Sequence, residues 1–421
     1  MLDIAFIRAN PDLVEKGAIA KNCKFDLPRL LEVDQSLRTL QTQWEIAQAS
    51  RNQLSREIAS CAPEAREALK DQVRELKTNL EEMQARLRDL RTEFHTRMLQ
   101  VPQPAREDVP QGKSDAENVQ VRTWGTPPAA STTPLDHIQL GEKLGIIDFE
   151  RGVKIAGSRS YVLKGDGARL EQAVHRFTFD YLVSKGFTAM SVPVLVNEMA
   201  MEGTGYFPQG RDQAYLAERD NMALVGTSEV ALCSLHADEI LEGPLPRRYM
   251  AQSSCFRREA GSYGRDTKGL YRVHQFQKIE MVILAPADEA LTDQLHTELL
   301  GHAEHVLQSL ELPYRVVYVC TGDLGQGQVR KHDLETWMPS RGGYGETHSC
   351  SSFYDFQARR LQIRYADESG KKRFVYTLNN TACATPRLLL PLLENFQNPD
   401  GTVRIPACLQ PYMGGQKIIG G

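Results

Sequence analysis

The chain has 421 residues, 41% of them hydrophobic, and a formal net charge of −4. This length and composition allow a sizeable core spread over two or three domains. The slightly acidic balance excludes the strongly basic composition of a general nucleic-acid binder, so any RNA contact must come from local patches or from shape.

The N-terminus carries no sign of a targeting segment. It lacks a long apolar run and a cleavage pattern, so we expect neither a secretory signal nor a transit peptide, and we expect no membrane span. The cysteines form no CxxC pair and no zinc spacing, which predicts reduced thiols, a cytoplasmic protein and no structural zinc. They are Cys23, Cys61, Cys233, Cys255, Cys320, Cys350, Cys383 and Cys408.

Two heptad-like seams occupy the N-terminal part of the chain. Apolar residues recur at spacings of three and four over residues 30–58 and again over residues 69–101. The sequence CAPE at residues 61–64 interrupts the pattern between them. This predicts a long antiparallel helical hairpin in an N-terminal domain of residues 1–101, with an arm roughly 45 Å long at ~1.5 Å per residue.

The sequence of this arm does not determine what the arm binds. A hairpin of this kind is consistent with dimerisation or with packing on a body. Against this alternative, the two seams can bury each other and leave a slender rod with charged flanks. Acidic and basic residues are nearly balanced along it, so the arm is no general phosphate binder. The second helix is richer in arginine and offers local phosphate contacts. The candidates are Arg86, Arg88, Arg91 and Arg97.

The hydrophobic periodicity stops over residues 102–134, where Pro, Gly, Ser and Thr accumulate, which predicts a linker. In residues 135–421 helices and short strands follow each other irregularly, with a helix over residues 288–310 and strands over residues 314–321, 353–365 and 374–378. No Gly-x-Gly-x-x-Gly loop or P-loop is present. We therefore expect an α+β domain with a mixed, mostly antiparallel sheet flanked by helices.

Residues 256–281, FRREAGSYGRDTKGLYRVHQFQKIEM, combine charges of both signs with glycines in a strand-turn-strand pattern. Alternate residues of the return strand share one face, and unpaired charges there could not rest on a dry core. Arginines suit phosphates and a carboxylate suits an amine, so we expect a nucleotide and a cationic group; a solvated edge hairpin is the alternative. The face carries Arg272, His274, Phe276, Lys278 and Glu280.

This stretch is similar to motif 2 of the class II aminoacyl-tRNA synthetases, in the form typical of the seryl-tRNA synthetase family. NNTACATPR at residues 379–387, followed by LLLPLLENFQ, resembles motif 3, and GFTAMSVPVLV at residues 186–196 resembles motif 1 more loosely. TSE at residues 227–229 and ETHS at residues 346–349 stand in the family order. The resemblance covers the whole chain and implies a tRNA-binding domain over residues 1–101 and a class II catalytic domain over residues 135–421.

The resemblance implies an ATP-dependent serine–tRNA ligase, which forms AMP and pyrophosphate. Such an enzyme activates L-serine as seryl-adenylate and transfers it to the 3′ end of tRNA(Ser), with tRNA(Sec) as an open second substrate. Positive charge and Mg²⁺ bring the two anions together, so no protein nucleophile is needed. The resemblance also implies a homodimer built on motif 1, with tRNA bound across the dimer and gripped by the arm through shape.

Three other functions remain possible alternatives to this ligase. A relative that charges a carrier protein would lack the long arm, and a non-catalytic RNA-binding coiled-coil protein would lose the motif arginines and acids. A paralogue acting in antibiotic resistance would keep every motif.

By resemblance, most of the site belongs to ATP. Arg257 is expected between the serine carboxylate and the α-phosphate. Arg387 is expected on the adenine opposite Phe276, with Glu259 and the backbone near Val273 on the base edge. Arg272 would meet the outer phosphates, and Glu346 and Ser349 would bind Mg²⁺. The full set of expected ATP contacts is Arg257, Arg258, Glu259, Arg272, Val273, Phe276, Glu346, Thr347, His348, Ser349 and Arg387.

The serine pocket needs an anion for the ammonium and partners for the hydroxyl. A carboxylate can accept from both groups, and a threonine can donate and accept. A pocket that bonds the hydroxyl rejects alanine strongly, whereas threonine is excluded only by its extra methyl. The matching positions are Thr227, Ser228, Glu229, Glu280 and Thr381.

Overall fold

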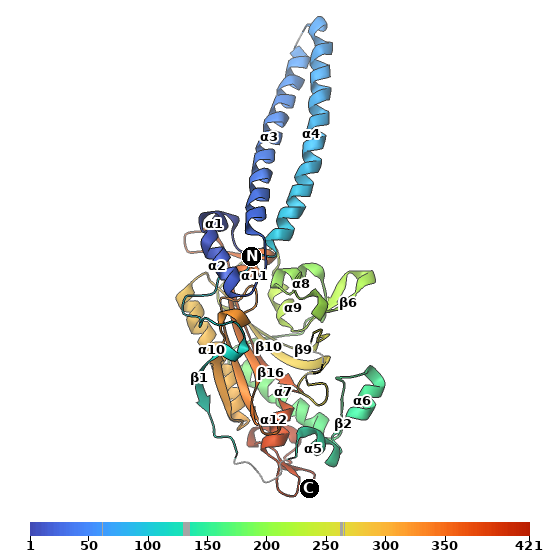
Figure 1. Cartoon of the computed structure of the whole chain (residues 1–421), viewed down its shortest axis with the longest axis vertical. Coiled ribbons are helices and arrows are strands. Elements are labelled where there is room, and N and C mark those ends of the chain that lie inside the picture. Colours follow the sequence, from blue (N-terminus) through green and yellow to red (C-terminus); the bar gives the residue numbers. More distant parts are fainter. Residues whose placement is uncertain (61, 129–134, 262–263, 265) are drawn as a thin grey trace. The chain divides into compact units, whose positions relative to one another are not determined.

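The computed structural model describes the whole chain except residues 61, 129–134, 262–263 and 265 (Figure 1). Cys61 of the predicted turn, the end of the predicted linker and part of the motif 2 loop therefore lie outside the described residues. The described chain divides into two compact units. One consists of Leu2–Ile19 and Cys23–Val101, and the other of Met1, Ala20–Asn22 and Pro102–Gly421.

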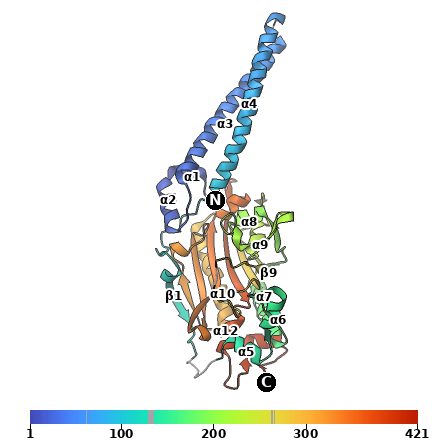
Figure 2. The same ribbon diagram turned by 45° about the vertical axis from the view of Figure 1, so that its right-hand side comes forward.

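The smaller unit contains the predicted arm, formed by α3 (Leu27–Ser60) and α4 (Pro63–Met98). The two helices run side by side along their length (Figure 2). The described positions of both predicted seams are buried or half-buried, and Leu40 and Leu87 are among the most enclosed. The antiparallel hairpin is thus confirmed. It is preceded by α1 (Ile4–Ala9) and α2 (Pro11–Ala20).

The candidate arm arginines all lie on α4. Arg86, Arg88 and Arg91 are exposed, and Arg91 donates to the side-chain oxygen of Gln41 on α3 at 2.9 Å. Arg97 is half-buried and pairs with Glu93 at 2.9 Å. Three of the four candidate arginines are therefore accessible to solvent.

Within the described residues, the larger unit is built on a sheet of eight strands in the order β1-β11-β12-β13-β16-β10-β9-β4. Neighbouring strands are antiparallel, except for β4 beside β9. The predicted mixed, mostly antiparallel sheet is confirmed. The strands are β1 (Val119–Trp124), β4 (Thr188–Met190), β9 (Arg247–Phe256), β10 (Gln275–Ala285), β11 (Tyr314–Tyr318), β12 (Arg330–Met338), β13 (Gly343–Tyr354) and β16 (Tyr376–Thr385).

The long helices α7 (Asp166–Ser184) and α10 (Glu289–Ser309) pack on one face of the sheet. Ile279 and Met281 of β10 lie in the same apolar core as Val174 of α7 and Leu299 of α10. Because side chains alternate along a strand, Phe276, Lys278 and Glu280 must project from the opposite face. That face holds the pocket described below.

A second apolar core lies farther along this opposite face. Val282 and Leu284 of β10 pack there against α9 (Glu229–Ser234) and α11 (Phe356–Leu361). The prediction of a strand over residues 353–365 was therefore wrong. Phe356, Ala358 and Leu361 are all buried, and this packing favours a helix that ends where Gln362 takes a positive φ of 56°.

The remaining elements are short. β1 lies within the predicted linker and pairs with β11, so this stretch contributes an edge strand. No helix in the described part of the chain is long and apolar enough to cross a membrane. The other elements are α5 (His137–Lys143), β2 (Ile147–Asp148), α6 (Phe149–Ala156), β3 (Val162–Leu163), β5 (Leu195–Asn197), α8 (Glu198–Thr204), β6 (Tyr215–Ala217), β7 (Met222–Leu224), β8 (Ile240–Leu241), β14 (Arg364–Ala366), β15 (Lys372–Phe374), α12 (Leu389–Asn395), β17 (Val403–Arg404) and β18 (Ile418–Ile419).

Candidate active site

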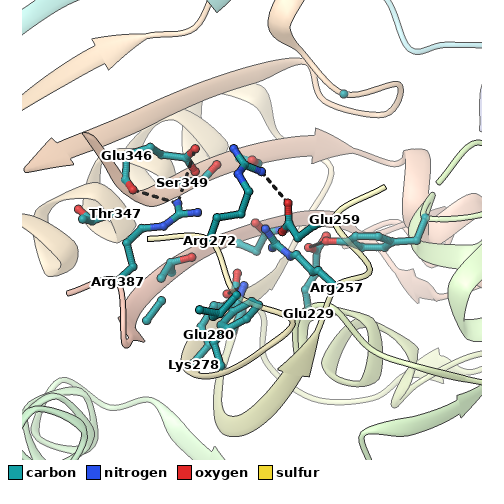
Figure 3. Close-up of a pocket in the computed structure, with 18 of the residues that line it drawn as sticks. Glu229, Arg257, Glu259, Arg272, Lys278, Glu280, Glu346, Thr347, Ser349 and Arg387 are labelled. Carbon is teal, nitrogen blue, oxygen red and sulfur yellow. Dashed lines mark hydrogen bonds and ion pairs between the residues drawn. The ribbon is translucent and has the colours of Figure 1, made fainter. Parts of the chain in front are cut away.

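A cavity of about 310 Å³ opens on the sheet face opposite α7 and α10. Its walls come from segments far apart in the sequence: the end of the motif 2 loop with β10, the strands β13 and β16, and the loops at residues 204–206 and 325–328. Figure 3 shows charged side chains of both signs converging on it. A volume of this size is typical of a small-molecule site.

The motif 2 strand lines the cavity, but it begins later than expected. β10 starts at Gln275, so the predicted alternation from Arg272 was wrong. Arg272 and Val273 precede the strand and both line the cavity. His274 turns away from it, and its Nδ1 lies 3.0 Å from the carbonyl oxygen of Arg257.

Charged groups of this segment are paired within the cavity wall. Arg272 donates to the Glu259 carboxylate at 2.6 Å, and Lys278 pairs with Glu280. The guanidinium of Arg257 lies over the Phe276 ring, 5.2 Å from its centroid. Because of these contacts, the charged side chains of this segment can lie in the cavity wall without leaving a buried charge unpaired.

A β-bulge brings Glu346 and Ser349 of β13 to the same side. Residues three apart on a regular strand point to opposite faces. Here the pairing with β12 shifts so that Thr347 is the extra residue between the partners of Leu334 and Glu335. Glu346 and Ser349 consequently both line the cavity.

A second bulge has the same effect on β16. The pairing with β10 moves from Ile279 opposite Cys383 to Glu280 opposite Thr381, which leaves Ala382 unpaired. Thr381 therefore faces the cavity directly across from Glu280. Asn379 lines it as well, and its buried Nδ2 has no hydrogen-bond partner among the described residues.

Arg387 follows β16 and closes the other end of the cavity. It donates to the backbone oxygens of Tyr271 and Glu346, both at 3.0 Å, and its guanidinium lies 4.5 Å from the centroid of the Tyr271 ring. Phe276, the expected partner of Arg387, is instead covered by Arg257. Tyr271 was not anticipated, although an aromatic residue beside Arg272 was visible in the sequence.

Glu229 is a buried acid of the cavity wall, and two neutral donors hold it. The Tyr206 hydroxyl donates to one carboxylate oxygen and the Gln357 amide to the other, both at 2.8 Å. Burial and the nearby negative charge of Glu280 raise the pKa of Glu229 to about 7. Tyr206 and Gln357 lie outside the quoted motifs, and nothing in the sequence pattern pointed to them.

Four of the predicted residues do not line the cavity. Thr227 accepts from the backbone N–H of Glu229 at 3.2 Å, and the buried Ser228 hydroxyl donates to Ala251. Arg258 donates to the backbone oxygen of Asp212. His348 alternates with Ser349, so its ring faces inward to the oxygen of Ala382, and burial lowers its pKa to about 4.

The other predicted side chains are brought together as expected. Those that line the cavity are Arg257, Glu259, Arg272, Val273, Phe276, Glu346, Thr347, Ser349 and Arg387 of the expected ATP set, and Glu229, Glu280 and Thr381 of the expected serine set.

The donors of Glu346 and Ser349 fit a hard cation. Both are oxygens on one side of β13, and Glu346 is exposed to the cavity. Among the described residues, no group of three or more His, Cys, Asp or Glu side chains could hold a metal ion. An ion at Glu346 and Ser349 would therefore take its remaining ligands from water and a phosphate, as Mg²⁺ does.

Known proteins resemble the chain along its full length. Residues 1–104 match the seryl-tRNA synthetase N-terminal domain, and residues 215–396 match the class II tRNA synthetase core domain (G, H, P, S and T). A serine–tRNA ligase of Deinococcus radiodurans is 45% identical over 100% of this chain and 99% of its own length. One of Acidithiobacillus ferrooxidans is 42% identical over 100% of both.

Solved structures show the same likeness. A seryl-tRNA synthetase from Pyrococcus horikoshii complexed with ATP has a TM-score of 0.91 and 36% identity over 100% of this chain and 99% of its own. A cytoplasmic serine–tRNA ligase from Naegleria fowleri in complex with AMP has a TM-score of 0.84 and 30% identity over 97% of this chain and 95% of its own.

Proposed function

The chain belongs to the seryl-tRNA synthetase family, and from this premise we propose that it activates L-serine with ATP and transfers the seryl group to tRNA(Ser). One observation carries the proposal: a single cavity has an acidic end at Glu229 and a basic side at Arg257, Arg272 and Arg387 (Figure 3). A zwitterionic amino acid and a triphosphate are the pair of ligands that such a charge distribution accommodates.

The amino acid is proposed to bind with its ammonium at Glu229 and its carboxylate toward Arg257. Lys278 and Glu280 neutralise each other, whereas the Glu229 carboxylate has no cationic partner among the described residues. An ammonium supplies that missing charge. The serine hydroxyl is assigned to Glu280 and Thr381, which face each other across two strands. The free amide donor of Asn379 lies beside them and can serve the same ligand.

ATP is proposed to occupy the opposite side. Arg387 and Phe276 would hold the adenine between a guanidinium and a ring, which requires that the base displace Arg257 from the Phe276 ring. The Glu259 carboxylate with the backbone near Val273 would meet the base edge. Arg272 would hold the outer phosphates. Its pairing with Glu259 at 2.6 Å shows that its guanidinium is oriented toward the cavity wall rather than into solvent.

Adenylation then requires positioning more than covalent chemistry. An oxygen of the serine carboxylate attacks the α-phosphorus and pyrophosphate leaves, so Arg257 is best placed to align both anions and to stabilise the charge that accumulates between them. Glu346 and Ser349 would hold Mg²⁺ together with the ATP phosphates. When bound there, Mg²⁺ would neutralise phosphate charge that the arginines leave uncompensated.

The tRNA and a second subunit complete the proposal. Exposed arginines of α4 would contact the tRNA backbone. A homodimer is supported by the exposed apolar side chains Val119, Val121 and Trp124 on the edge strand β1 and Leu195 in the motif 1 segment. We propose that tRNA binds across that dimer. Whether tRNA(Sec) is a second substrate is left to the charging experiment below. No disulfide joins the described cysteines, which supports a cytoplasmic location.

Pyrophosphate exchange tests the first half-reaction. With Mg²⁺ and no tRNA, the purified protein should exchange pyrophosphate into ATP when serine is present and not with alanine or glycine, because these leave the polar groups at Glu280 and Thr381 unpaired. Exchange that responds to alanine or glycine but not to serine would contradict the pocket assignment.

Charging of purified tRNAs with radiolabelled serine tests the second half-reaction. Transfer to tRNA(Ser) is expected, and a parallel sample with tRNA(Sec) answers whether this tRNA is a substrate. Serine-dependent exchange without charging of any tRNA would favour a carrier protein or a serine-like antibiotic as the partner in place of tRNA.

A further inference from the structure

We propose that Gln357 and Tyr206 are positioning residues that fix the Glu229 carboxylate as the receptor for the substrate ammonium. The inference rests on the proposed function, because it takes Glu229 as the group that binds the amine. Within the described residues, neither side chain hydrogen-bonds to a member of the expected ATP set. Their effect should therefore be confined to the amino acid and absent for ATP.

Gln357 is held in one orientation by its neighbours. It is fully buried on α11, and its side-chain amide donates to Glu229 at 2.8 Å and to the backbone oxygen of Thr204 at 3.1 Å. Its carbonyl oxygen accepts from the Thr377 hydroxyl at 2.6 Å and from the Cys233 thiol at 3.6 Å. Every donor and acceptor of the amide is used, so a flip would turn its oxygen against a carboxylate and leave several buried groups unpaired.

Tyr206 completes the support from the other side. Its hydroxyl donates to Oε2 of Glu229 while Gln357 serves Oε1, so each carboxylate oxygen receives one hydrogen bond from a side chain. A carboxylate offers about four acceptor positions. The two that remain can be offered to an ammonium, and the plane of the carboxylate is fixed before the substrate arrives.

The two supports share the property that they carry no charge. A lysine or arginine at either position would neutralise Glu229 and compete with the substrate ammonium. Lys278, whose charge acts on Glu229, pairs instead with Glu280, and Arg257 lies over the Phe276 ring. Neutral donors thus stabilise the carboxylate and leave its charge for the ligand.

The protonation state of Glu229 gives this arrangement a measurable signature. Burial and Glu280 raise the pKa of Glu229 to about 7, and hydrogen bonds from Gln357 and Tyr206 and the charge of Lys278 act in the opposite direction. The remaining titratable neighbours, Tyr206 and Cys233, have pKa values raised by burial and stay neutral at this pH. Removing a donor should therefore raise the pKa of Glu229 further and leave it protonated at higher pH.

Two variants remove the supports one at a time: Tyr206→Phe and Gln357→Met. Steady-state exchange is measured for serine and for ATP separately from about pH 6 to 9, a range that brackets the raised pKa. Loss of one hydrogen bond to a charged group should raise KM for serine by about tenfold or more. The acid limb of kcat/KM for serine should move to higher pH, whereas KM for ATP should stay within about twofold.

Three further variants separate this role from a structural one. Tyr249→Phe makes the same change on β9, where the hydroxyl contacts His236 at 3.0 Å and not Glu229, and should behave as the unmodified protein. Thr377→Val frees the carbonyl of Gln357 without touching Glu229 and should give an intermediate shift. Glu229→Gln should abolish the response to serine, which tests the proposed function itself.

The outcomes are distinguishable. If Glu229→Gln keeps its KM for serine, the assignment of the amine site fails. If Glu229→Gln loses the response but Tyr206→Phe and Gln357→Met keep both the KM for serine and the acid limb, the positioning role alone is wrong. A parallel rise of KM for serine and ATP with a lowered Tm in both support variants would also overturn it, in favour of general packing.

Discussion

At the scale of single residues, most charged side chains of the cavity contact an oppositely charged group or an aromatic ring. Arg272 has Glu259, Lys278 has Glu280 and Arg257 lies on Phe276. Glu229 differs, because only neutral groups hold it. Glu229 therefore carries a charge that no described side chain neutralises in an ion pair, and the proposed amine site rests on that charge.

Replacing Arg257 or Arg387 by Ala should reduce serine-dependent pyrophosphate exchange by about a hundredfold or more. Each replacement removes a preorganised positive charge that would stabilise the ATP phosphates. The unfolding midpoint should change little, since both side chains border an open cavity. Exchange kinetics and thermal unfolding measure the two effects. Arg404→Ala, which removes an exposed pair with Glu311 outside the residues that line the cavity, is the matched control. An equal loss of folding and activity would make the two cavity arginines structural.

The part of the site that strand periodicity alone could not place has two physical reasons. Phe276, Lys278 and Glu280 could be placed on one face because a strand has period two. Glu346 with Ser349 and Thr381 with Glu280 depend on bulges, and one inserted residue reverses the face of everything beyond it. Tyr206, Tyr271 and Gln357 reach the site through tertiary packing alone.

At the scale of elements, the arm was the easiest part to predict and α11 the hardest. A heptad seam repeats over many turns, so its signal accumulates along α3 and α4. The stretch that contains α11 is short, and a run of this length reads equally well as strand or helix until its packing partners are known. The cost of that ambiguity was Gln357, which cannot be assigned to Glu229 if its backbone is extended.

The motif 2 loop is anchored where it returns to the sheet. Gly269 has a φ of 86°, and a Cβ there would collide with Nε2 of His137. The same nitrogen accepts from the N–H of Leu270 at 3.1 Å, while Nδ1 of His137 lies 2.8 Å from Glu394. This contact fixes the backbone just before Tyr271 and Arg272, which supports the proposed ATP side of the cavity.

Gly269→Ala should therefore raise KM for ATP several-fold and leave KM for serine less affected. Gly264→Ala is its matched control, because Gly264 has a similar φ of 77° but no described atom lies within 4 Å of the added methyl group. Both variants carry backbone strain, and one alone carries the collision. Separate titrations of ATP and serine in the exchange assay provide the measurement. Equal behaviour of the two variants would show that strain, and not the contact with His137, sets the effect.

The bulge on β13 predicts how the enzyme depends on Mg²⁺. Glu346→Gln should raise the Mg²⁺ concentration needed for half-maximal exchange, because the neutral amide is a poorer ligand for a hard cation. Glu335→Gln is the control. Glu335 is the β12 residue opposite Glu346, and its own carboxylate contacts Arg315 at 2.5 Å. This variant should leave the Mg²⁺ dependence unaltered. Matching Mg²⁺ curves for both variants and the unmodified protein would remove Glu346 from the metal site.

At the scale of the whole molecule, the two compact units are proposed to divide the work. The described residues that line the cavity all belong to the larger unit, and the exposed arginines of α4 to the smaller one. Activation of serine should therefore need the larger unit alone, and charging of tRNA should need both. A chain that lacks residues 37–94, rejoined by a short flexible turn, is expected to exchange pyrophosphate and to fail in charging.

This division allows a test of whether tRNA binds across a dimer. In a two-fold assembly the arm of one subunit can serve the site of the other. One subunit lacks residues 37–94 and keeps its site, and the other keeps its arm and carries Arg257→Ala. Neither homodimer should charge tRNA, because each lacks either the delivery of tRNA or the chemistry of activation.

The mixed dimer should charge tRNA(Ser), since an intact arm then presents the tRNA to an intact site on the neighbouring chain. Two different affinity tags isolate the mixed dimer, and serine-dependent exchange confirms that its one intact site is active before charging is measured. A mixed dimer that exchanges pyrophosphate normally and still leaves tRNA uncharged would mean that arm and site must belong to one chain. In that case the tRNA would follow its own subunit, and binding across the dimer would be wrong.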